Sequence, residues 1–495
     1  MRRTSLAAAA LLAAAPSLLW AGSQITIVNA DAAGQGMNDP AAATPVGGNP
    51  GTTLGQQRLN VVQRSADIWA GFLDSPVEIR IQVRFANLTC TSNSAVLAST
   101  NVVQMTSDFS PGAGFPGPEF PSTWYPTALA NRRAGRDLIP GNTNTNADDI
   151  SVRINSNLGQ TGCGFDWYYG FDSQHGSKTD LITTLLHEYA HGFGFLTAVN
   201  PSTGFELSSQ PDIFERKILD TDSGKFWPEL TDAGRAASAT SGNKLAFAGV
   251  FTTATAPGVL SGTPTLRVAA PAAIAGNYLI GVASFGPKLT EGGLSGTLVA
   301  ALDAADATGP TMFDACTALT NTSEVSGKVA LVDRGTCTFV SKTLNAQAGG
   351  AIAVVVADNV DGSPPPGLGG DDPTITIPAV RITKADGATL RASLSAGVTV
   401  KLWLDPSRRA GTDGADHVLL YAPNTVESGS SVSHWDTTAF PNLLMEPNVN
   451  DDLTHGVDLT LAAFRDIGWY ADIPARGTLA PVHRPHAAQA LTPRQ

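Results

Sequence analysis

The stretch that decides the fold reads His187-Glu188-Tyr189-Ala190-His191 and is followed directly by Gly192-Phe193-Gly194. Two histidines four residues apart lie on one side of a helix, where both imidazoles can bind the same zinc ion. The glutamate next to the first histidine can then accept a proton from a water molecule that the ion activates. The alternative, a surface helix with incidental charges, gives no reason for this spacing.

We predict that this helix runs from Thr179 to Phe193 and ends abruptly at Gly194, because its apolar residues recur at helical spacing. In such a helix His187 and His191 share a side that faces a cleft, while the apolar side covers a core. The sequence therefore predicts His187 and His191 as zinc ligands and Glu188 as the general base.

A catalytic zinc ion usually has three protein ligands and one position open to water. A compact form of this motif would place the third histidine at position 197, but Thr197 stands there. The third ligand must therefore come from another part of the chain. The remaining histidines are His175, His417, His434, His455, His483 and His486.

The stretch Gly429-Ser430-Ser431-Val432-Ser433-His434-Trp435 is followed by Met445 in Leu443-Leu444-Met445-Glu446-Pro447. Together with the helix motif and residues 458–470, it resembles the leishmanolysin family of metzincin zinc peptidases. The resemblance covers the helix and about the last 50 residues. It implies that His434 is the third zinc ligand and that Met445 lies in a Met-turn beneath the metal. Because that family carries a long insertion before its third histidine, Thr197 is expected; without the resemblance, His455 would compete with His434.

The middle of the chain resembles a different family. Residues 329–339 read Val-Ala-Leu-Val-Asp-Arg-Gly-Thr-Cys-Thr-Phe, and Lys342, residues 346–351 and residues 377–380 follow. These stretches are similar to the protease-associated (PA) domain, an accessory module of about 140 residues in secreted peptidases. The resemblance implies no catalysis by this module, which is expected to bind substrate or a partner.

The expected fold class is α+β: a metzincin-type zinc peptidase domain, with a twisted sheet and an active-site helix, interrupted by an α/β PA domain. Composition changes near residue 238 and returns near residue 405. The expected parts are a signal peptide (1–22), the N-terminal catalytic part (23–238), the PA domain (239–405), the C-terminal catalytic part (406–475) and a flexible tail (476–495).

Periodicity predicts further elements in each part. The expected strands are Ile25–Val28, Val77–Phe85, Asp149–Ile154, Lys328–Val332, Ala351–Ala357 and Ile375–Ile382. The expected helices are Gln56–Phe72, Thr338–Ala348 and one that carries Val457, Leu461, Phe464 and Ile467 and ends at Gly468.

The net charge of the chain and its N-terminal residues indicate which partners it binds and where it is located. The formal net charge is −12 and the isoelectric point is near 5.1, which argues against nucleic acid as a partner. Arg2-Arg3 followed by a short apolar stretch predicts a signal peptide and a secreted protein, rather than a membrane anchor, because Pro16 breaks the stretch. No stable membrane insertion is expected.

Export makes disulfides plausible for the four cysteines of the chain. Three pairings are open, and we favour Cys90 with Cys163 and Cys316 with Cys337, the latter as a structural staple.

The predicted function is that of a secreted zinc metalloendopeptidase, with Zn²⁺ as cofactor and proteins or peptides as substrates. Two rival hypotheses remain: an exported binding or adhesion protein with an inactive peptidase fold, and a zinc hydrolase that acts on a non-peptide bond.

Overall fold

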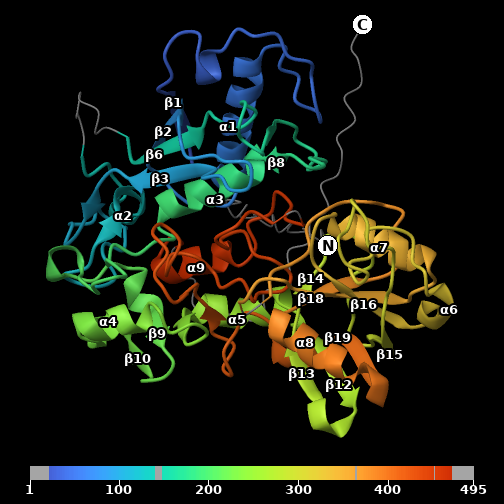
Figure 1. The fold of residues 1–495 in the computed structure, drawn as a ribbon. Coiled ribbons are helices and arrows are strands. Elements are labelled where there is room, and N and C mark those ends of the chain that lie inside the picture. Colours follow the sequence, from blue (N-terminus) through green and yellow to red (C-terminus); the bar gives the residue numbers. More distant parts are fainter. Residues whose placement is uncertain (1–21, 140–147, 363–364, 451, 471–495) are drawn as a thin grey trace, which may run out of the picture.

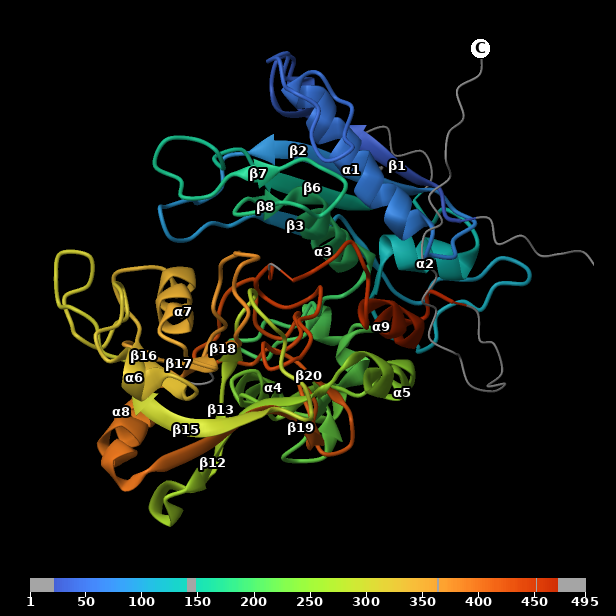
Figure 2. The same cartoon turned by 90° about the vertical axis from the view of Figure 1, so that its right-hand side faces the viewer.

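The computed structural model describes residues 22–139, 148–362, 365–450 and 452–470. The expected signal peptide, apart from residue 22, and the expected tail lie outside these residues. Both views place strand β1 (Ile25–Asn29) and helix α1 (Leu54–Ala70) at one end of the molecule (Figures 1 and 2). Strands β12 (Gly262–Ala270), β15 (Leu294–Ala300) and β19 (Val398–Arg409) lie at the other end.

The first sheet has the strand order β1-β2-β6-β3. Strands β1 (Ile25–Asn29), β2 (Ile79–Ala86) and β6 (Ile150–Asn155) are parallel, and β3 (Ala98–Val102) is an antiparallel edge strand. Helices α1 (Leu54–Ala70) and α3 (Leu181–Phe193) contact each other and pack against this sheet. In β2 and β6, buried residues alternate with more exposed ones, as the period-two pattern predicts.

The second sheet has eight strands in the order β13-β12-β19-β15-β16-β17-β18-β14. Apolar clusters on its two faces form two cores separate from that of the first sheet. Its strands are β12 (Gly262–Ala270), β13 (Gly276–Leu279), β14 (Gly281–Val282), β15 (Leu294–Ala300), β16 (Val329–Asp333), β17 (Ala353–Ala357), β18 (Ala379–Ile382) and β19 (Val398–Arg409). Helix α7 (Phe339–Ala348) connects the parallel strands β16 and β17, which makes the expected strand–helix–strand unit.

A small antiparallel sheet, β10-β9-β11-β20, joins the two halves of the chain around the inserted module. Strand β11 (Leu245–Phe247) pairs with β20 (Val418–Leu419), and β9 (Ile218–Asp220) and β10 (Lys225–Phe226) complete the sheet. Helix α5 (Val250–Val259) contacts α9 (Thr460–Ile467).

The segment 245–260 therefore differs from the expectation that residues from 239 onward belong to the inserted module. Leu245, Phe247, Ala256 and Leu260 pack in the core of the first sheet, and the strands of the eight-stranded sheet begin only at Gly262. The change in composition near residue 238 precedes this change in packing by about two dozen residues, because small apolar residues suit either core.

The remaining elements are short. They are the strands β4 (Met105–Thr106), β5 (Tyr125–Pro126), β7 (Trp167–Tyr168) and β8 (Thr179–Asp180), the helices α2 (Thr127–Ala134), α4 (Asp232–Ser238), α6 (Thr322–Val325) and α8 (Lys384–Ser393), and the 3-10 helices Gly36–Asn38, Leu207–Ser209, Glu215–Lys217, Trp227–Glu229, Ala272–Ile274 and Leu394–Ala396.

Several expected boundaries differ from the structure by two residues or more, among them Val77 against Ile79 for β2 and Ala351 against Ala353 for β17, and three of them bear on the argument. The zinc-motif helix begins at Leu181 and not at Thr179, because the carboxylate of Asp180 accepts hydrogen bonds from the first backbone amides and so caps the helix. The last helix begins at Thr460 and not near Val457. Strand β18 begins at Ala379 and not at Ile375, because Asp372 and Thr374 hold the preceding residues in a turn.

Both expected disulfides, Cys90–Cys163 and Cys316–Cys337, are confirmed. The first joins cysteines 73 residues apart, and the second joins cysteines 21 residues apart. Cross-linking restricts the unfolded chain, and a longer loop restricts it more.

Replacing Cys90 and Cys163 together by alanine is expected to lower the free energy of unfolding by about 4 kcal/mol, against about 3 kcal/mol for the shorter loop of Cys316 and Cys337. Calorimetry of the two double variants measures this. The larger loss should appear in the transition of the first sheet, and an unchanged melting temperature would contradict the expectation.

Candidate metal centre

Helix α3 is positioned by its buried apolar face and by two glycines near its C-terminal end. Its apolar face, Leu181, Ile182, Leu185, Leu186 and Tyr189, is fully buried. At Gly194 the backbone adopts a φ of +118°, which an L side chain rarely tolerates, so the helix stops there and the chain turns. Two residues earlier, a Cβ on Gly192 would lie 2.5 Å from the side chain of Ile150 in β6, so the glycine lets the helix approach the sheet closely.

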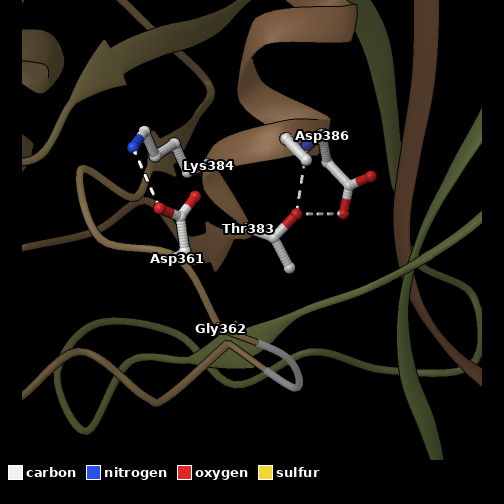
Figure 3. A pocket seen from close by; sticks show the side chains of 6 residues that line it. Asp361, Gly362, Thr383, Lys384 and Asp386 are labelled. Carbon is white, nitrogen blue, oxygen red and sulfur yellow. Dashed lines mark hydrogen bonds and ion pairs between the residues drawn. The ribbon is translucent and has the colours of Figure 1, made fainter.

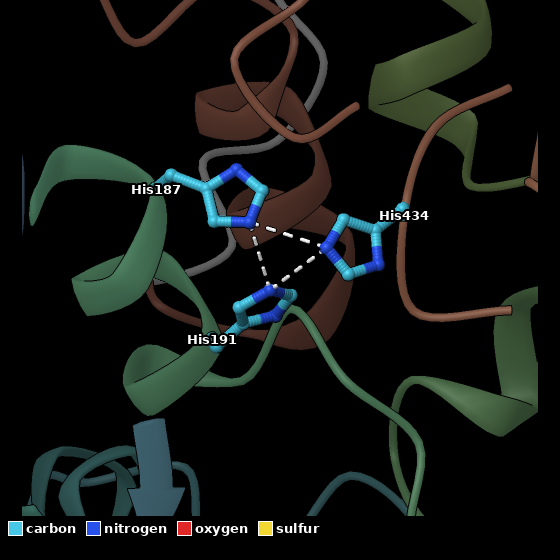
Figure 4. A group of neighbouring side chains, drawn as sticks. All are labelled: His187, His191 and His434. Atoms are coloured by element: carbon cyan, nitrogen blue, oxygen red, sulfur yellow. Dashed lines mark hydrogen bonds between the residues drawn. The ribbon is translucent and has the colours of Figure 1, made fainter. Parts of the chain in front are cut away.

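The structure brings His187, His191 and His434 together (Figure 4). The Nε2 atoms of His187 and His191 are 3.1 Å apart, and each lies 3.2 Å from Nε2 of His434. Nitrogen ligands of a tetrahedral zinc ion, at about 2.0–2.1 Å from the metal, are about 3.3 Å apart. The triangle of nitrogens therefore has the size that one zinc ion requires.

The opposite ring nitrogens explain why the three Nε2 atoms face one another. Each Nδ1 lies 2.7 Å from a backbone carbonyl oxygen: His187 from that of Leu444, His191 from that of Phe195, and His434 from that of Ser430. A carbonyl can only accept, so each Nδ1 carries the hydrogen and each Nε2 presents a lone pair.

Three lone pairs at hydrogen-bond distance, with no hydrogen between them, repel one another unless a cation lies among them. The donor set of three neutral imidazoles thus fits a metal ion, and His187, His191 and His434 are the residues that would hold it.

Burial keeps the imidazoles neutral. It lowers the pKa of His187 to about 4 and, together with the neighbouring His187, the pKa of His191 to about 3. Burial, with His191 and His187 nearby, also lowers the pKa of His434 well below its usual range. Neutral imidazole is the form that binds a metal ion, so at neutral pH no proton has to leave before binding.

Glu188 lies beside this group and is buried. Its Oε2 accepts a hydrogen bond of 2.6 Å from the hydroxyl of Thr100, in the edge strand β3. Burial raises the pKa of Glu188 to about 7, and the bond from Thr100 lowers it. A carboxylate whose pKa is near neutrality can both take up and release a proton, as a general base must.

A cleft of about 960 Å³ passes over the three histidines and Glu188. The cleft is lined by the segment 93–102, which includes β3, and by residues 428–430 and 447–450. Residues that precede α3, including His175 and Lys178, and residues that follow it, including Leu196 and Ala198, also line the cleft. The lining of the cleft therefore includes residues from the segments before and after α3.

Met445 is fully buried in the turn that follows His434. Its carbonyl oxygen accepts a hydrogen bond of 2.8 Å from the amide of Trp435, the residue after His434. The neighbouring Leu444 accepts from His187, and its own amide donates to the carboxylate of Asp458. The turn thus contacts the segments of two of the three histidines.

His455, the competitor for the third ligand position, lies elsewhere. Its Nε2 is 2.8 Å from Oδ2 of Asp180, at the start of α3, and it is not part of the histidine group. His175 contacts the carbonyl of Lys178, and His417 pairs with Asp413. His483 and His486 lie outside the described residues.

Sequence reasoning did not find Thr100, which contacts Glu188, and it assigned no role to Asp458, which contacts the Met445 turn. Both residue types are common, and Thr100 is 88 positions from its partner. A regular pattern reveals neighbours within one element, and these pairs connect different elements.

A second pocket, of about 370 Å³, lies in the inserted module and is lined by residues 361–362 and 383–386 (Figure 3). Its polar side chains bind one another: Lys384 pairs with Asp361, and the hydroxyl of Thr383 contacts the carboxylate of Asp386 at the start of α8. These pairs account for the charges there, and the pocket lies outside the cleft of the histidines.

Residues 294–390 match the family model of the PA domain, which confirms the expected PA domain within the inserted module. A curated relative, the probable lipoprotein aminopeptidase LpqL of Mycobacterium tuberculosis, is 40% identical over 111 residues, which are 22% of this chain and 21% of that protein. Vacuolar-sorting receptor 3 of Arabidopsis thaliana is 33% identical over 152 residues, 28% of this chain and 24% of the receptor.

The chain spans 21–28% of the length of these curated relatives and of the probable leucine aminopeptidase 2 of Aspergillus fumigatus. Among solved structures, the zinc aminopeptidase BSAP of Bacillus subtilis is 24% identical, with a TM-score of 0.22, over 31% of this chain and 36% of that chain. Because aminopeptidases and a sorting receptor share segments of similar length with this chain, the shared segment does not specify one activity.

Within the part of the chain that the structure describes, no helix has the length and apolar character needed to cross a membrane.

Proposed function

We propose that this protein is a secreted zinc metalloendopeptidase of the metzincin type. The observation that carries the proposal is the set of three histidine lone pairs, from α3 and a distant loop, that meet beside Glu188 in an open cleft. A bound zinc ion would supply Lewis-acid chemistry there, polarising a carbonyl and making a water molecule acidic.

Glu188 is proposed as the general base. It follows a ligand directly, yet its carboxylate is turned to β3 and the cleft, where Thr100 orients it by one hydrogen bond. In this role it takes a proton from water and returns it to the amine that leaves. Thr100 binds one carboxylate oxygen, and the other oxygen is left for the proton.

The edge strand β3 supports a peptide as substrate. It pairs with β6 on one side only, and residues 98–102 line the cleft with their other edge. An extended peptide can bind such an edge as an additional strand through main-chain hydrogen bonds. Because segments before and after α3 both line this cleft of about 960 Å³, it has room for a chain on either side of the histidines, which favours internal cleavage.

The metzincin assignment rests on the same elements that carry the resemblance. His434 follows the inserted module, and the Met445 turn binds the backbone next to it. The PA domain is proposed to bind substrate or a partner, since none of the residues within 294–390 that the structure describes lines the cleft. The two disulfides suit an extracellular location.

Two alternatives give different results in one experiment. An exported adhesion protein with an inactive fold would bind no zinc or would cleave nothing. A zinc hydrolase for non-peptide bonds would bind zinc and hydrolyse esters or simple amides but leave casein intact.

The expected result is one zinc ion per chain and cleavage of casein at internal bonds. Removal of the metal with 1,10-phenanthroline should abolish cleavage, and added Zn²⁺ should restore it. Metal analysis and mass spectrometry of the products measure both. A zinc-loaded chain that leaves casein and a library of unstructured peptides intact would overturn the proposal.

A further inference from the structure

Position 197 has a structural role although it carries no metal ligand. The backbone amide of Thr197 donates a hydrogen bond of 3.2 Å to the hydroxyl of Ser433, the residue directly before His434. The hydroxyl of Thr197 donates a bond of 2.7 Å to Oδ2 of Asp212. Thr197 thus connects the chain that leaves α3 to the loop that brings the third histidine.

Asp212 is a fixed point in this arrangement, since it is only 2% exposed. Its Oδ2 also accepts from the amide of Ala198 at 2.7 Å, and its Oδ1 accepts from the amide of Glu215 at 2.7 Å. Its backbone forms a parallel bridge with Trp124, and the next amide, Ile213, donates to the carbonyl of Trp124. These hydrogen bonds fix the orientation of the buried carboxylate.

The same short segment also reaches the second histidine. The carbonyl oxygen of Phe195 accepts from Nδ1 of His191 at 2.7 Å, and two residues later the amide of Thr197 binds Ser433. The segment 195–198 therefore contacts both His191 and the neighbour of His434, and Asp212 holds it at Thr197 and Ala198.

From these contacts we propose that Thr197 and Asp212 are positioning residues, which fix His434 relative to His191 through Ser433. The inference rests on the proposed function, because it assumes that the three histidines bind zinc.

Apolar packing alone would leave this placement loose. The rings of Phe195 and Trp435 lie 4.7 Å apart, and Phe214 and Phe247 extend the cluster beneath them. Ring contacts stabilise the association of the two segments, but aromatic pairs accept centroid distances over a range of about 4.5–7 Å. Hydrogen bonds are directional, and a metal ion requires its ligands within a few tenths of an ångström.

The test compares Thr197→Val, which keeps the shape but loses the hydroxyl, with Thr197→Ser, which keeps the hydroxyl. Zinc dissociation constants are measured by competition with a chelator on the full-length chain. We expect Thr197→Val and Ser433→Ala each to weaken zinc binding about 10-fold or more, as loss of an outer partner does, and Thr197→Ser to stay within about 3-fold of wild type.

Two further measurements separate positioning from general stability. The absorption spectrum of the cobalt-substituted protein should change in Thr197→Val but not in Thr197→Ser. The double variant Thr197→Val/Ser433→Ala should bind zinc no more weakly than the weaker single variant, because both act on one connection. Thr221→Val is the matched control, since its exposed hydroxyl binds the carbonyl of Lys244, outside the cleft.

Each outcome decides between the two proposals. A wild-type chain without zinc affinity overturns the proposed function and this inference with it. If the wild type binds zinc and Thr197→Val binds it equally well with an unchanged cobalt spectrum, only the positioning role is overturned. Equal losses in Thr197→Val and Thr197→Ser would also overturn it, since the hydroxyl would then not matter.

Discussion

Replacing Glu188 by glutamine is expected to lower kcat for peptide cleavage by about 100- to 10,000-fold, the usual contribution of a general base. Glutamine has nearly the shape of glutamate and can still accept the hydrogen bond from Thr100, but it cannot take up a proton from water. The rate of cleavage of a fluorogenic peptide, measured at saturating zinc, reports the change.

Zinc content and melting temperature should be unchanged in Glu188→Gln, because the glutamate is not among the three histidines that we propose as ligands. Glu291→Gln, an exposed position in the inserted module, is the control for the chemical change and should keep full activity. Activity within about threefold of the wild type in Glu188→Gln would remove the glutamate from the mechanism.

Replacing His434 by alanine is expected to abolish stoichiometric zinc binding and, with it, peptide cleavage. Two imidazoles on α3 remain, and a catalytic zinc ion normally needs three protein ligands. The dissociation constant should rise by more than the roughly 10- to 100-fold that loss of an outer partner causes. Metal analysis after dialysis against buffered zinc measures the loss.

His455→Ala is the matched control for this prediction. His455 is the other histidine that the sequence allows as third ligand, but it binds Asp180 at the start of α3. Its replacement should leave one zinc ion per chain, with at most a modest loss of stability from the changed helix cap. If His455→Ala loses zinc and His434→Ala keeps it, the assignment of the third ligand is wrong.

Local sequence patterns predicted the elements on which the site is built. The spacing of His187 and His191, the apolar face of α3 and the glycine at 194 all act within one helix, so they can be recognised in a short stretch. The alternating residues of β2 and β6 and the strand–helix–strand unit of the PA domain are local in the same sense.

Several boundaries could not be predicted in this way. The segment 245–260 has a composition that suits either core, and only its pairing with β20 and its contact with α9 assign it to the first. The predicted helix began two residues too early, at Thr179, because a side chain such as Asp180 that caps a helix also occurs in turns and at strand ends.

The proposed zinc site shows most clearly which features follow from the sequence and which from the tertiary structure. The chain sequence identifies His187, Glu188 and His191 from their spacing on one helix, and resemblance to a known family adds His434. The folded structure alone shows that His434, 243 positions after His191, returns to 3.2 Å from it, and that Thr197, Asp212 and Ser433 connect the two segments. Such contacts between distant segments depend on the packing of whole elements, which no short pattern of residues encodes.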